Sequence, residues 1–224
     1  MCGRFAQQHP ASELAELFAA EPLVDDAGAR FNLAPTDPAL VVVQRDDRRA
    51  VVSYRWGLVP HWATSAGNAA RTINARAETG AVSPTFRESF RRRRCIVPAD
   101  AFYEWRRDGG VRQPFVIRRR DGLPLAFAGL WAGWRDPLSG EVRRTFAIVT
   151  AGASAVVAPV HDRMPVILPP GAWATWLDPT LVDPGELHGM LVPVDPDTLE
   201  VYPVRRLVYS ISNVGPVMLE RVTA

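Results

Sequence analysis

Residues 39–57, with the sequence ALVVVQRDDRRAVVSYRWG, consist of two apolar segments on either side of a short charged one. Valine, tyrosine and tryptophan favour β-strands, whereas the charged residues around Asp46 and Asp47 are typical of a turn. Strands that are adjacent in sequence and joined by a tight turn pair antiparallel. The stretch therefore predicts an antiparallel pair of strands.

Strands also dominate the chain beyond this pair. Apolar runs rich in valine, isoleucine and aromatic residues are separated by glycine-containing turns, such as those at 108–110 and 121–122. These runs predict further strands at 94–99, 101–106, 114–119, 123–134, 144–151 and 199–205.

Four short segments have the pattern of helices, namely 12–20, 83–91, 170–177 and 184–190. Ser12 and Ser83 are expected to cap the first two, with Pro84 in the first turn of the second. Because the helices do not alternate regularly with the strands, the expected class is α+β. No repeat or linker divides the chain, so we expect one domain over residues 1–224.

Composition argues against a membrane protein and against a metal site. Hydrophobic residues make up 47% of the 224 residues, but no apolar run approaches the roughly 18 that cross a bilayer, and no secretory leader precedes the first expected helix. Cys2 and Cys95 are not spaced as zinc ligands, and both should be thiols in a reducing compartment. We expect a cytoplasmic protein without metal or cofactor, in which Cys95 is a buried core thiol.

Every one of the 26 residues counted as lysine or arginine is an arginine. Without lysine, the N-terminal α-amine is the only primary amine, so Schiff-base chemistry would have to take place there. The densest arginine run, at 91–94, is expected to be a solvated surface, and phosphate binding by it is the less favoured alternative.

Cys2 directly follows the initiator methionine. Removal of that methionine would leave an amine and a thiol on the same residue, with ordinary pKa values near 8 and 8.5, so a useful fraction of each should be nucleophilic at neutral pH. A 1,2-aminothiol condenses with an aldehyde to an imine, which the sulfur closes to a thiazolidine. The same residue could instead act as an N-terminal nucleophile that hydrolyses amides, or it could be incidental.

Two candidate acid–base residues lie in otherwise apolar segments. Glu104 is next to aromatic residues in the strand 101–106, where its pKa could be raised for general acid–base chemistry; the alternative is a structural salt bridge with an arginine. His161 precedes Asp162 and Arg163 between an apolar segment and a proline, and its alternative is a structural hydrogen bond.

Further candidates could hold a ligand. Asn74 and Arg76 could hold a carbonyl or sugar and a phosphate, although a helix cap and a surface arginine are the simpler explanation. Trp56 and Trp62 could be core residues or stacking platforms. His61, between them, is expected to face solvent.

Six motifs occur in order: MCGRF, FNLAPT, WGLVPHW, INARAET, CIVPADAFYEW and HDRMPVIL. Together they resemble the SRAP family, the SOS response-associated peptidases, also called abasic-site processing proteins. The resemblance is clear from residue 1 to about 168 and continues more weakly to the C-terminus. It implies a barrel-like, mostly antiparallel sheet with flanking short helices.

The resemblance also implies a function. Proteins of this family bind single-stranded DNA and become cross-linked to abasic sites, which shields the lesion during the DNA damage response. It implies a catalytic set of Cys2, Asn74, Glu104 and His161, and a DNA-binding set of Arg4, Pro35, Trp62, Asn74, Arg76, Trp105, Thr150 and Arg163. The partner is then single-stranded DNA that contains abasic sites, and the protein is expected to be a monomer.

Two alternatives remain beside this function. The same Cys2, Glu104 and His161 could form an N-terminal-nucleophile peptidase, or the chain could be a non-catalytic single-strand binder in which Cys2 is incidental. The sequence departs from the family pattern at Pro84, where some relatives have a basic residue, and at Tyr209, where asparagine is more usual. These departures concern peripheral DNA contacts.

Overall fold

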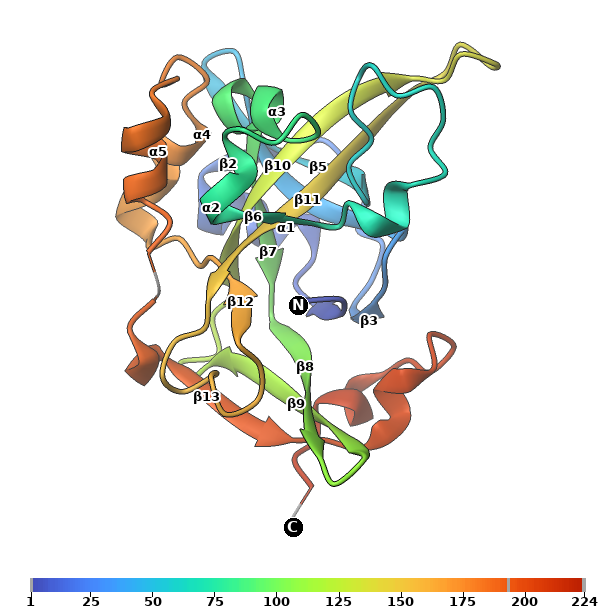
Figure 1. Cartoon of the computed structure of the whole chain (residues 1–224), viewed down its shortest axis with the longest axis vertical. Helices are drawn as coiled ribbons and strands as arrows, with labels where there is room; N and C mark the ends of the chain where they lie inside the picture. The colour runs from blue at the N-terminus through green and yellow to red at the C-terminus, as the bar shows by residue number, and fades with distance from the viewer. Residues whose placement is uncertain (1, 193, 223–224) are drawn as a thin grey trace.

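The hairpin expected within residues 39–57 is the first part of a barrel. Strands β4 (Pro38–Arg45) and β5 (Arg48–Trp56) pair antiparallel along their whole length, and Asp46 in the connecting turn has a φ of 50°. The structure is a computed structural model and describes residues 2–192 and 194–222 (Figure 1).

Five strands close on themselves. The strands β7 (Arg94–Ala99), β10 (Leu125–Arg135) and β11 (Val142–Gly152) continue the sheet from β4, and β11 then pairs with β5 in parallel. The closing contact joins Thr145 to Arg55 and Phe146 to Trp56. Three short strands extend this sheet: β2 (Ala20–Pro22) alongside β5, and β6 (Asn74–Arg76) and β12 (Arg163–Pro165) alongside β11.

A second sheet lies below the barrel in Figure 1. Its strand order is β13 (Leu199–Pro203), β9 (Val111–Arg119), β8 (Ala101–Asp108), β1 (Phe5–Gln7) and β3 (Arg30–Leu33), and all neighbours are antiparallel. The expected α+β class with a barrel-like, mostly antiparallel core is therefore confirmed.

Alternate residues of the barrel strands enter two separate cores. Val41, Val43 and Val52 belong to a cluster with Phe127 and Phe146, whereas Val42 and Val51 on the opposite face pack with residues of the helices. Burial of each such side chain contributes about 1.5 to 3 kcal/mol. Because both faces of β4 are covered, its apolar residues follow one another without interruption, and this run is the pattern that predicted the strand.

Short helices cover the outside of the barrel. They are α1 (Ala11–Phe18), α2 (Ala77–Gly80), α3 (Arg87–Arg92), α4 (Trp173–Leu177) and α5 (Pro184–Gly189). The 3-10 turns are Ala69–Arg71, Pro170–Ala172, Pro196–Thr198, Arg206–Tyr209 and Pro216–Leu219, and the last two pack on the second sheet. Within the described residues, none of the helices has the length and apolar character needed to cross a lipid bilayer.

Both expected serine caps are wrong. Helix α1 begins at Ala11, before Ser12, and the Ala11 N–H donates to the carboxylate of Asp26. Helix α3 begins only at Arg87, with Phe86 in the cap position and no side-chain cap bond, and Ser83 lies in the turn before it. The expected helix at 170–177 is likewise divided into a 3-10 turn and α4. At α1, the N–H group at the start of the helix is satisfied by the carboxylate of Asp26, which is distant in sequence, so a local sequence pattern does not reveal it.

Arg94 corrects the expectation of a solvated arginine run. Arg91 and Arg92 are exposed, but Arg94 is only 3% exposed, and all of its guanidinium N–H groups are directed at backbone carbonyls. The acceptors are the carbonyls of Phe90, Arg91, Trp176, Asp178 and Leu181. These carbonyls lie in and around the ends of α3 and α4, so one cation ties the two helices together.

Replacing Arg94 with methionine should destabilise the protein by about 3 kcal/mol or more, because several buried carbonyls lose their donor at once. Arg92→Met, in the same run but exposed, is the matched control and should change the stability by less than about 0.5 kcal/mol. Urea unfolding of both variants measures the difference. Equal stabilities would show that Arg94 is not a structural link.

The two sheets are joined through Gln7 at the end of β1. Its buried side-chain amide donates to the carbonyls of Leu40 and Pro98 at 3.0 and 2.8 Å, and its oxygen accepts from the Leu40 N–H at 2.8 Å. Because β1 belongs to the second sheet while Leu40 and Pro98 belong to the barrel, these bonds set where the N-terminal segment enters. That segment carries Cys2.

Candidate functional site

Cys2 lies in the apolar core, in the same cluster as Phe5 and Phe102, and is fully buried. Strand β1 pairs antiparallel with β8, with Phe5 opposite Phe102, and the Tyr103 N–H donates to the Arg4 carbonyl at 3.0 Å. In an antiparallel pair, residues before Phe5 run alongside those after Phe102. The register therefore brings Cys2 to the part of β8 that carries Glu104.

Glu104 is 2% exposed and faces His161, which lies in the loop between β11 and β12. The distance between Glu104 Oε2 and His161 Nε2 is 4.0 Å. The Arg163 N–H donates to His161 Nδ1 at 2.9 Å, so in the neutral ring the proton is on Nε2, directed to the carboxylate side. Asp162 also lies 2.9 Å from Nδ1, but its side chain is 87% exposed and water screens its charge.

Burial sets the protonation of this group of residues. It raises the pKa of Glu104 to about 7, so this carboxyl can exchange protons near neutrality. It lowers the pKa of His161, which favours the neutral ring. It also raises the pKa of the Cys2 thiol far above its usual range, and the Glu104 carboxylate acts in the same direction. In the chain that still carries Met1, burial therefore favours the neutral thiol. The ionisation expected of Cys2 after removal of Met1 stays a prediction.

Asn74 connects β6 to the N-terminal segment. Its side-chain Nδ2 donates to the backbone carbonyl of Cys2 at 2.8 Å, and β6 is held in place by its parallel pairing with β11. Arg76, two residues further on the same strand, is exposed and lies opposite Thr150. The structure thus brings together Cys2, Asn74, Glu104 and His161 from four separate segments.

Comparisons with known proteins show the family to which the chain belongs. The family profile described as "SOS response associated peptidase (SRAP)" matches residues 1–211. The chain belongs to the SRAP family. The abasic site processing protein YoqW of Bacillus subtilis is 36% identical over 98% of this chain and 99% of its own length, and YedK of Escherichia coli is 31% identical over 99% and 100%.

A solved structure shares the SRAP fold of this chain. A protein from Bacteroides thetaiotaomicron is 26% identical, with a TM-score of 0.88 over 99% of this chain and 100% of that one. The resemblance seen in the six sequence motifs is therefore confirmed at the level of the family and of the fold.

Arg163 of this SRAP chain is already paired. Its guanidinium makes two parallel bonds to the Glu78 carboxylate, at 2.8 and 2.9 Å, and donates to the Thr150 carbonyl at 2.6 Å. The Arg163 bond lowers the pKa of Glu78. Thr150 is fully buried, so in this structure it supports Arg163 and does not face solvent. A DNA phosphate that reached Arg163 would compete with Glu78.

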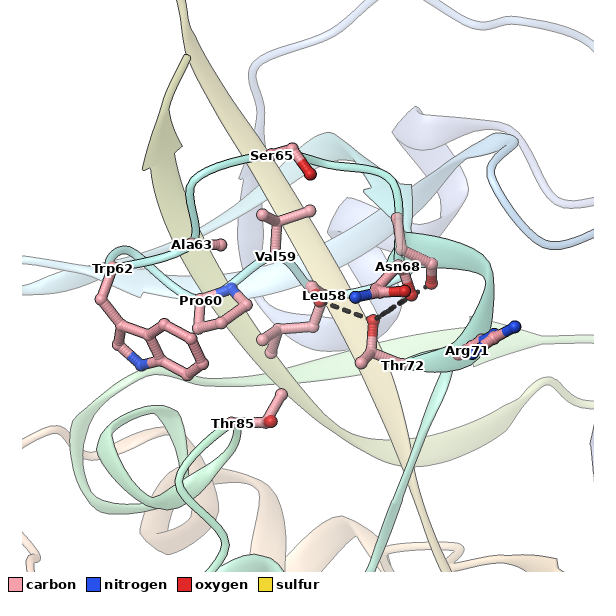
Figure 2. A pocket seen from close by; sticks show the side chains of 11 residues that line it. Leu58, Val59, Pro60, Trp62, Ala63, Ser65, Asn68, Arg71, Thr72 and Thr85 are labelled. Carbon is pink, nitrogen blue, oxygen red and sulfur yellow. Dashed lines mark hydrogen bonds between the residues drawn. The ribbon is translucent and has the colours of Figure 1, made fainter. Parts of the chain in front are cut away.

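Trp62 belongs to a different pocket of the SRAP fold. Its side chain is 57% exposed and lines a cavity of about 320 Å³ formed by the loop that follows β5 (Figure 2). Thr72 closes this loop by donating to the Leu58 carbonyl at 2.7 Å. The loop begins at Gly57, whose φ is 122° and where a Cβ would lie 2.4 Å from the Ala69 carbonyl oxygen, so glycine is required there. Trp56 is a core residue, which decides between its two alternatives. His61 is exposed, as expected.

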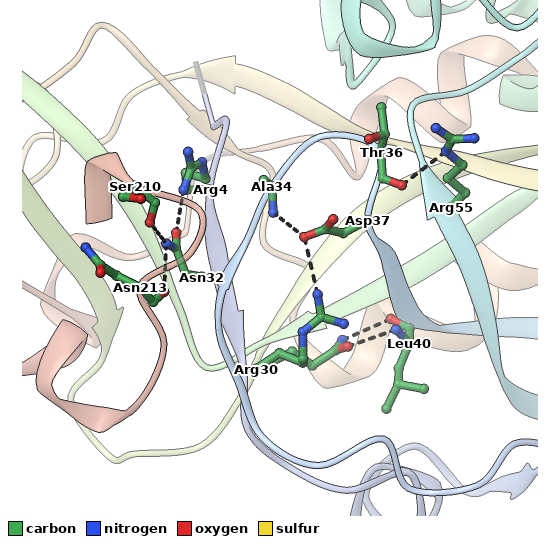
Figure 3. Close-up of polar contacts among 11 residues, drawn as sticks. Arg4, Arg30, Asn32, Ala34, Thr36, Asp37, Leu40, Arg55, Ser210 and Asn213 are labelled. Carbon is green, nitrogen blue, oxygen red and sulfur yellow. Dashed lines mark hydrogen bonds and ion pairs between the residues drawn. The ribbon is translucent and has the colours of Figure 1, made fainter. Parts of the chain in front are cut away.

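The Arg4 side chain is held by Asn32 and by the C-terminal part of the chain (Figure 3). Its Nη1 donates to Asn32 Oδ1 at 2.6 Å and to the Val208 carbonyl at 3.0 Å, and Asn32 in turn donates to the Ser210 carbonyl at 2.9 Å. These bonds fasten the segment after the Arg206–Tyr209 turn to the second sheet. Pro35, in the connection between β3 and β4, is half-buried. The structure does not bring Arg4, Pro35 and Trp62 into the pocket of Glu104.

Two arginines that the sequence did not single out line the Glu104 pocket. This cavity of about 220 Å³ is bordered by Glu104, Trp105, Arg107, Arg112 and His161. Trp105 is half-buried, and its ring lies 6.0 Å from that of Tyr209. The sequence held a signal for them: if the expected strands 101–106 and 114–119 pair as a hairpin and continue toward the turn, Arg107 lies opposite Arg112.

Within residues 2–192 and 194–222, no cluster of three or more His, Cys, Asp or Glu is arranged to hold a metal ion.

Proposed function

We propose that this protein binds single-stranded DNA and captures abasic sites covalently through Cys2, shielding the lesion during the DNA damage response. The observation that carries the proposal is the position of Cys2. It is buried near Glu104, which in turn faces His161, and its carbonyl accepts from Asn74 at 2.8 Å. Relatives named abasic site processing proteins support the choice of substrate.

The first step is exposure of the aldehyde. An abasic deoxyribose is mostly closed as a hemiacetal, so its ring oxygen must gain a proton while the C1 hydroxyl loses one. Glu104 has a pKa of about 7, so it can give a proton and take one back at neutral pH. His161, whose Nε2 faces the same carboxylate, is positioned to contact the sugar oxygen.

The second step joins the protein to the sugar. After removal of Met1, the Cys2 amine attacks the aldehyde carbon, and loss of one water gives the imine. The sulfur then attacks the same carbon, the thiol proton leaves, and the C=N electron pair returns to nitrogen, which takes up a proton. The product is a thiazolidine. Because burial raises the pKa of the thiol, its proton should leave during the attack and not before it.

Positioning accounts for the rate of these steps. Asn74 holds the Cys2 backbone, and Arg76 on the same strand is exposed where a phosphate could lie. Holding amine and sugar in contact makes a bimolecular condensation effectively intramolecular. Contacts to phosphates do not read sequence, so binding should be sequence-tolerant and should weaken with added salt.

Incubation with an oligonucleotide that carries one abasic site tests the proposal. We expect a species with the summed mass of protein and DNA that survives boiling, together with a linked N-terminal peptide that has lost Met1. Protein that keeps a tag on its N-terminus should not form it. An adduct formed at normal speed by the tagged protein would refute the proposed chemistry.

A further inference from the structure

Arg107 and Arg112 lie directly opposite each other near the end of the β8–β9 hairpin. Both side chains line the cavity that also contains Glu104 and His161. The hairpin forms the lower end of the molecule in Figure 1, well away from the barrel strands β10 and β11. Two arginines that lie outside the six family motifs therefore border the candidate site.

Two like charges on directly opposed residues repel each other unless an anion lies between or beside them. Among the described residues, neither Arg107 nor Arg112 forms an ion pair with a carboxylate. The β4–β5 hairpin offers a comparison, because Arg45 and Arg48 are also opposed there. In that hairpin Glu21 compensates, with its carboxylate 3.0 Å from Arg48.

The backbone that carries this pair is well supported. The Tyr209 hydroxyl donates to the Arg112 carbonyl at 2.6 Å, and the Tyr209 ring packs beside Trp105. Next to Arg112, the Gln113 amide donates to the Val204 carbonyl at 2.8 Å. Tyr209, where the sequence departs from the family pattern, thus helps to hold the strand on which Arg112 lies.

We propose that Arg107 and Arg112 together bind a phosphate of the DNA strand next to the abasic sugar. This assignment rests on the proposed function and adds the residues that would bind the DNA phosphate on one side of the proposed site. An abasic sugar keeps a phosphate on each side, and the planar guanidinium is suited to phosphate oxygens. Arg76 on β6 would bind the phosphate on one side of the sugar, and Arg107 with Arg112 would bind the phosphate on the other side. The DNA strand would then lie across Glu104 and His161.

The test uses the double variant Arg107→Gln/Arg112→Gln and the matched control Arg45→Gln/Arg48→Gln, which removes the same charge from the other opposed pair. Binding is measured by fluorescence anisotropy to an oligonucleotide with a tetrahydrofuran abasic analogue, which cannot open to an aldehyde. This readout does not depend on cross-linking, so it separates failure of the pair from failure of the proposed capture chemistry.

The Arg107/Arg112 variant should bind the analogue about tenfold more weakly at low salt than the control does, and the slope of log K against log salt should be smaller by about 0.7 to 1.4. Arg107→Lys/Arg112→Lys should recover most of the salt dependence. In the wild type, one methylphosphonate beside the analogue should weaken binding, and the Gln double variant should be insensitive to the same substitution.

Equal affinity and equal salt slope in the two Gln double variants would overturn the proposal. So would a methylphosphonate effect that persists in full when both arginines are absent. Thermal unfolding midpoints of the two double variants should agree, which excludes loss of structure as the cause of weak binding.

Discussion

Cys2→Ala should abolish the boil-resistant adduct with abasic DNA. Alanine keeps the N-terminal amine but has no sulfur, so the reaction should stop at the imine. An open imine is prone to β-elimination at the sugar, and strand cleavage should therefore replace the stable adduct. Adding borohydride, which reduces imines, should recover a cross-link with the variant protein.

Cys95→Ala is the matched control for this experiment. Cys95 is also a fully buried thiol, but it lies on β7 within the barrel, and burial raises its pKa as it does for Cys2. The variant should form the adduct in full. A stable, unreduced adduct with Cys2→Ala would instead exclude the sulfur from the chemistry. If Cys2→Ala also failed to lose Met1, the amide-hydrolase alternative would gain support.

Glu104→Gln should slow capture by about a hundredfold or more, because a positioned acid–base group contributes about 10² to 10⁴ to a rate. Affinity for the tetrahydrofuran analogue should change by less than about threefold, because glutamine keeps the shape of the side chain. The wild-type capture rate should depend on an ionisation close to the Glu104 pKa of about 7, and the variant should lack that dependence. Single-turnover kinetics over pH 5 to 9 measure both effects.

Stability gives an independent readout for the same variant. The folded pKa of Glu104, about 7, lies above the ordinary value of 4.5, so the native state binds the extra proton between these values. The contribution of this group to stability is therefore complete below pH 4.5 and is lost as the pH rises through 7. Glutamine does not titrate, so Glu104→Gln should gain roughly 2 to 3 kcal/mol relative to wild type between pH 5 and pH 8.

Glu13→Gln controls for the loss of an ordinary carboxylate. Glu13 is exposed in the first turn of α1, and its variant should match the wild type in capture rate. Equal losses of capture and of DNA binding in Glu104→Gln would demote Glu104 to a structural role.

The strand pattern was largely predictable. Apolar runs rich in valine, isoleucine and aromatic residues located β4, β5, β7, β8, β9, β10, β11 and β13, because these strands bury side chains on one or both faces. Cys2 and Glu104 could also be chosen as candidates from the sequence, one for its place behind the first methionine and one for its aromatic neighbours. The absence of lysine already restricted imine chemistry to the N-terminus.

Contacts between residues far apart in the chain could not be predicted from such local patterns. The parallel pairing of β5 with β11 that closes the barrel joins residues about 90 positions apart, and the burial of Arg94 depends on carbonyls from α4. Likewise, only the folded chain brings His161 to 4.0 Å from Glu104 and the Asn74 amide to the Cys2 carbonyl. Residue types and local periodicity follow from the covalent chain, but pKa values and the gathering of a site depend on what each group is buried against.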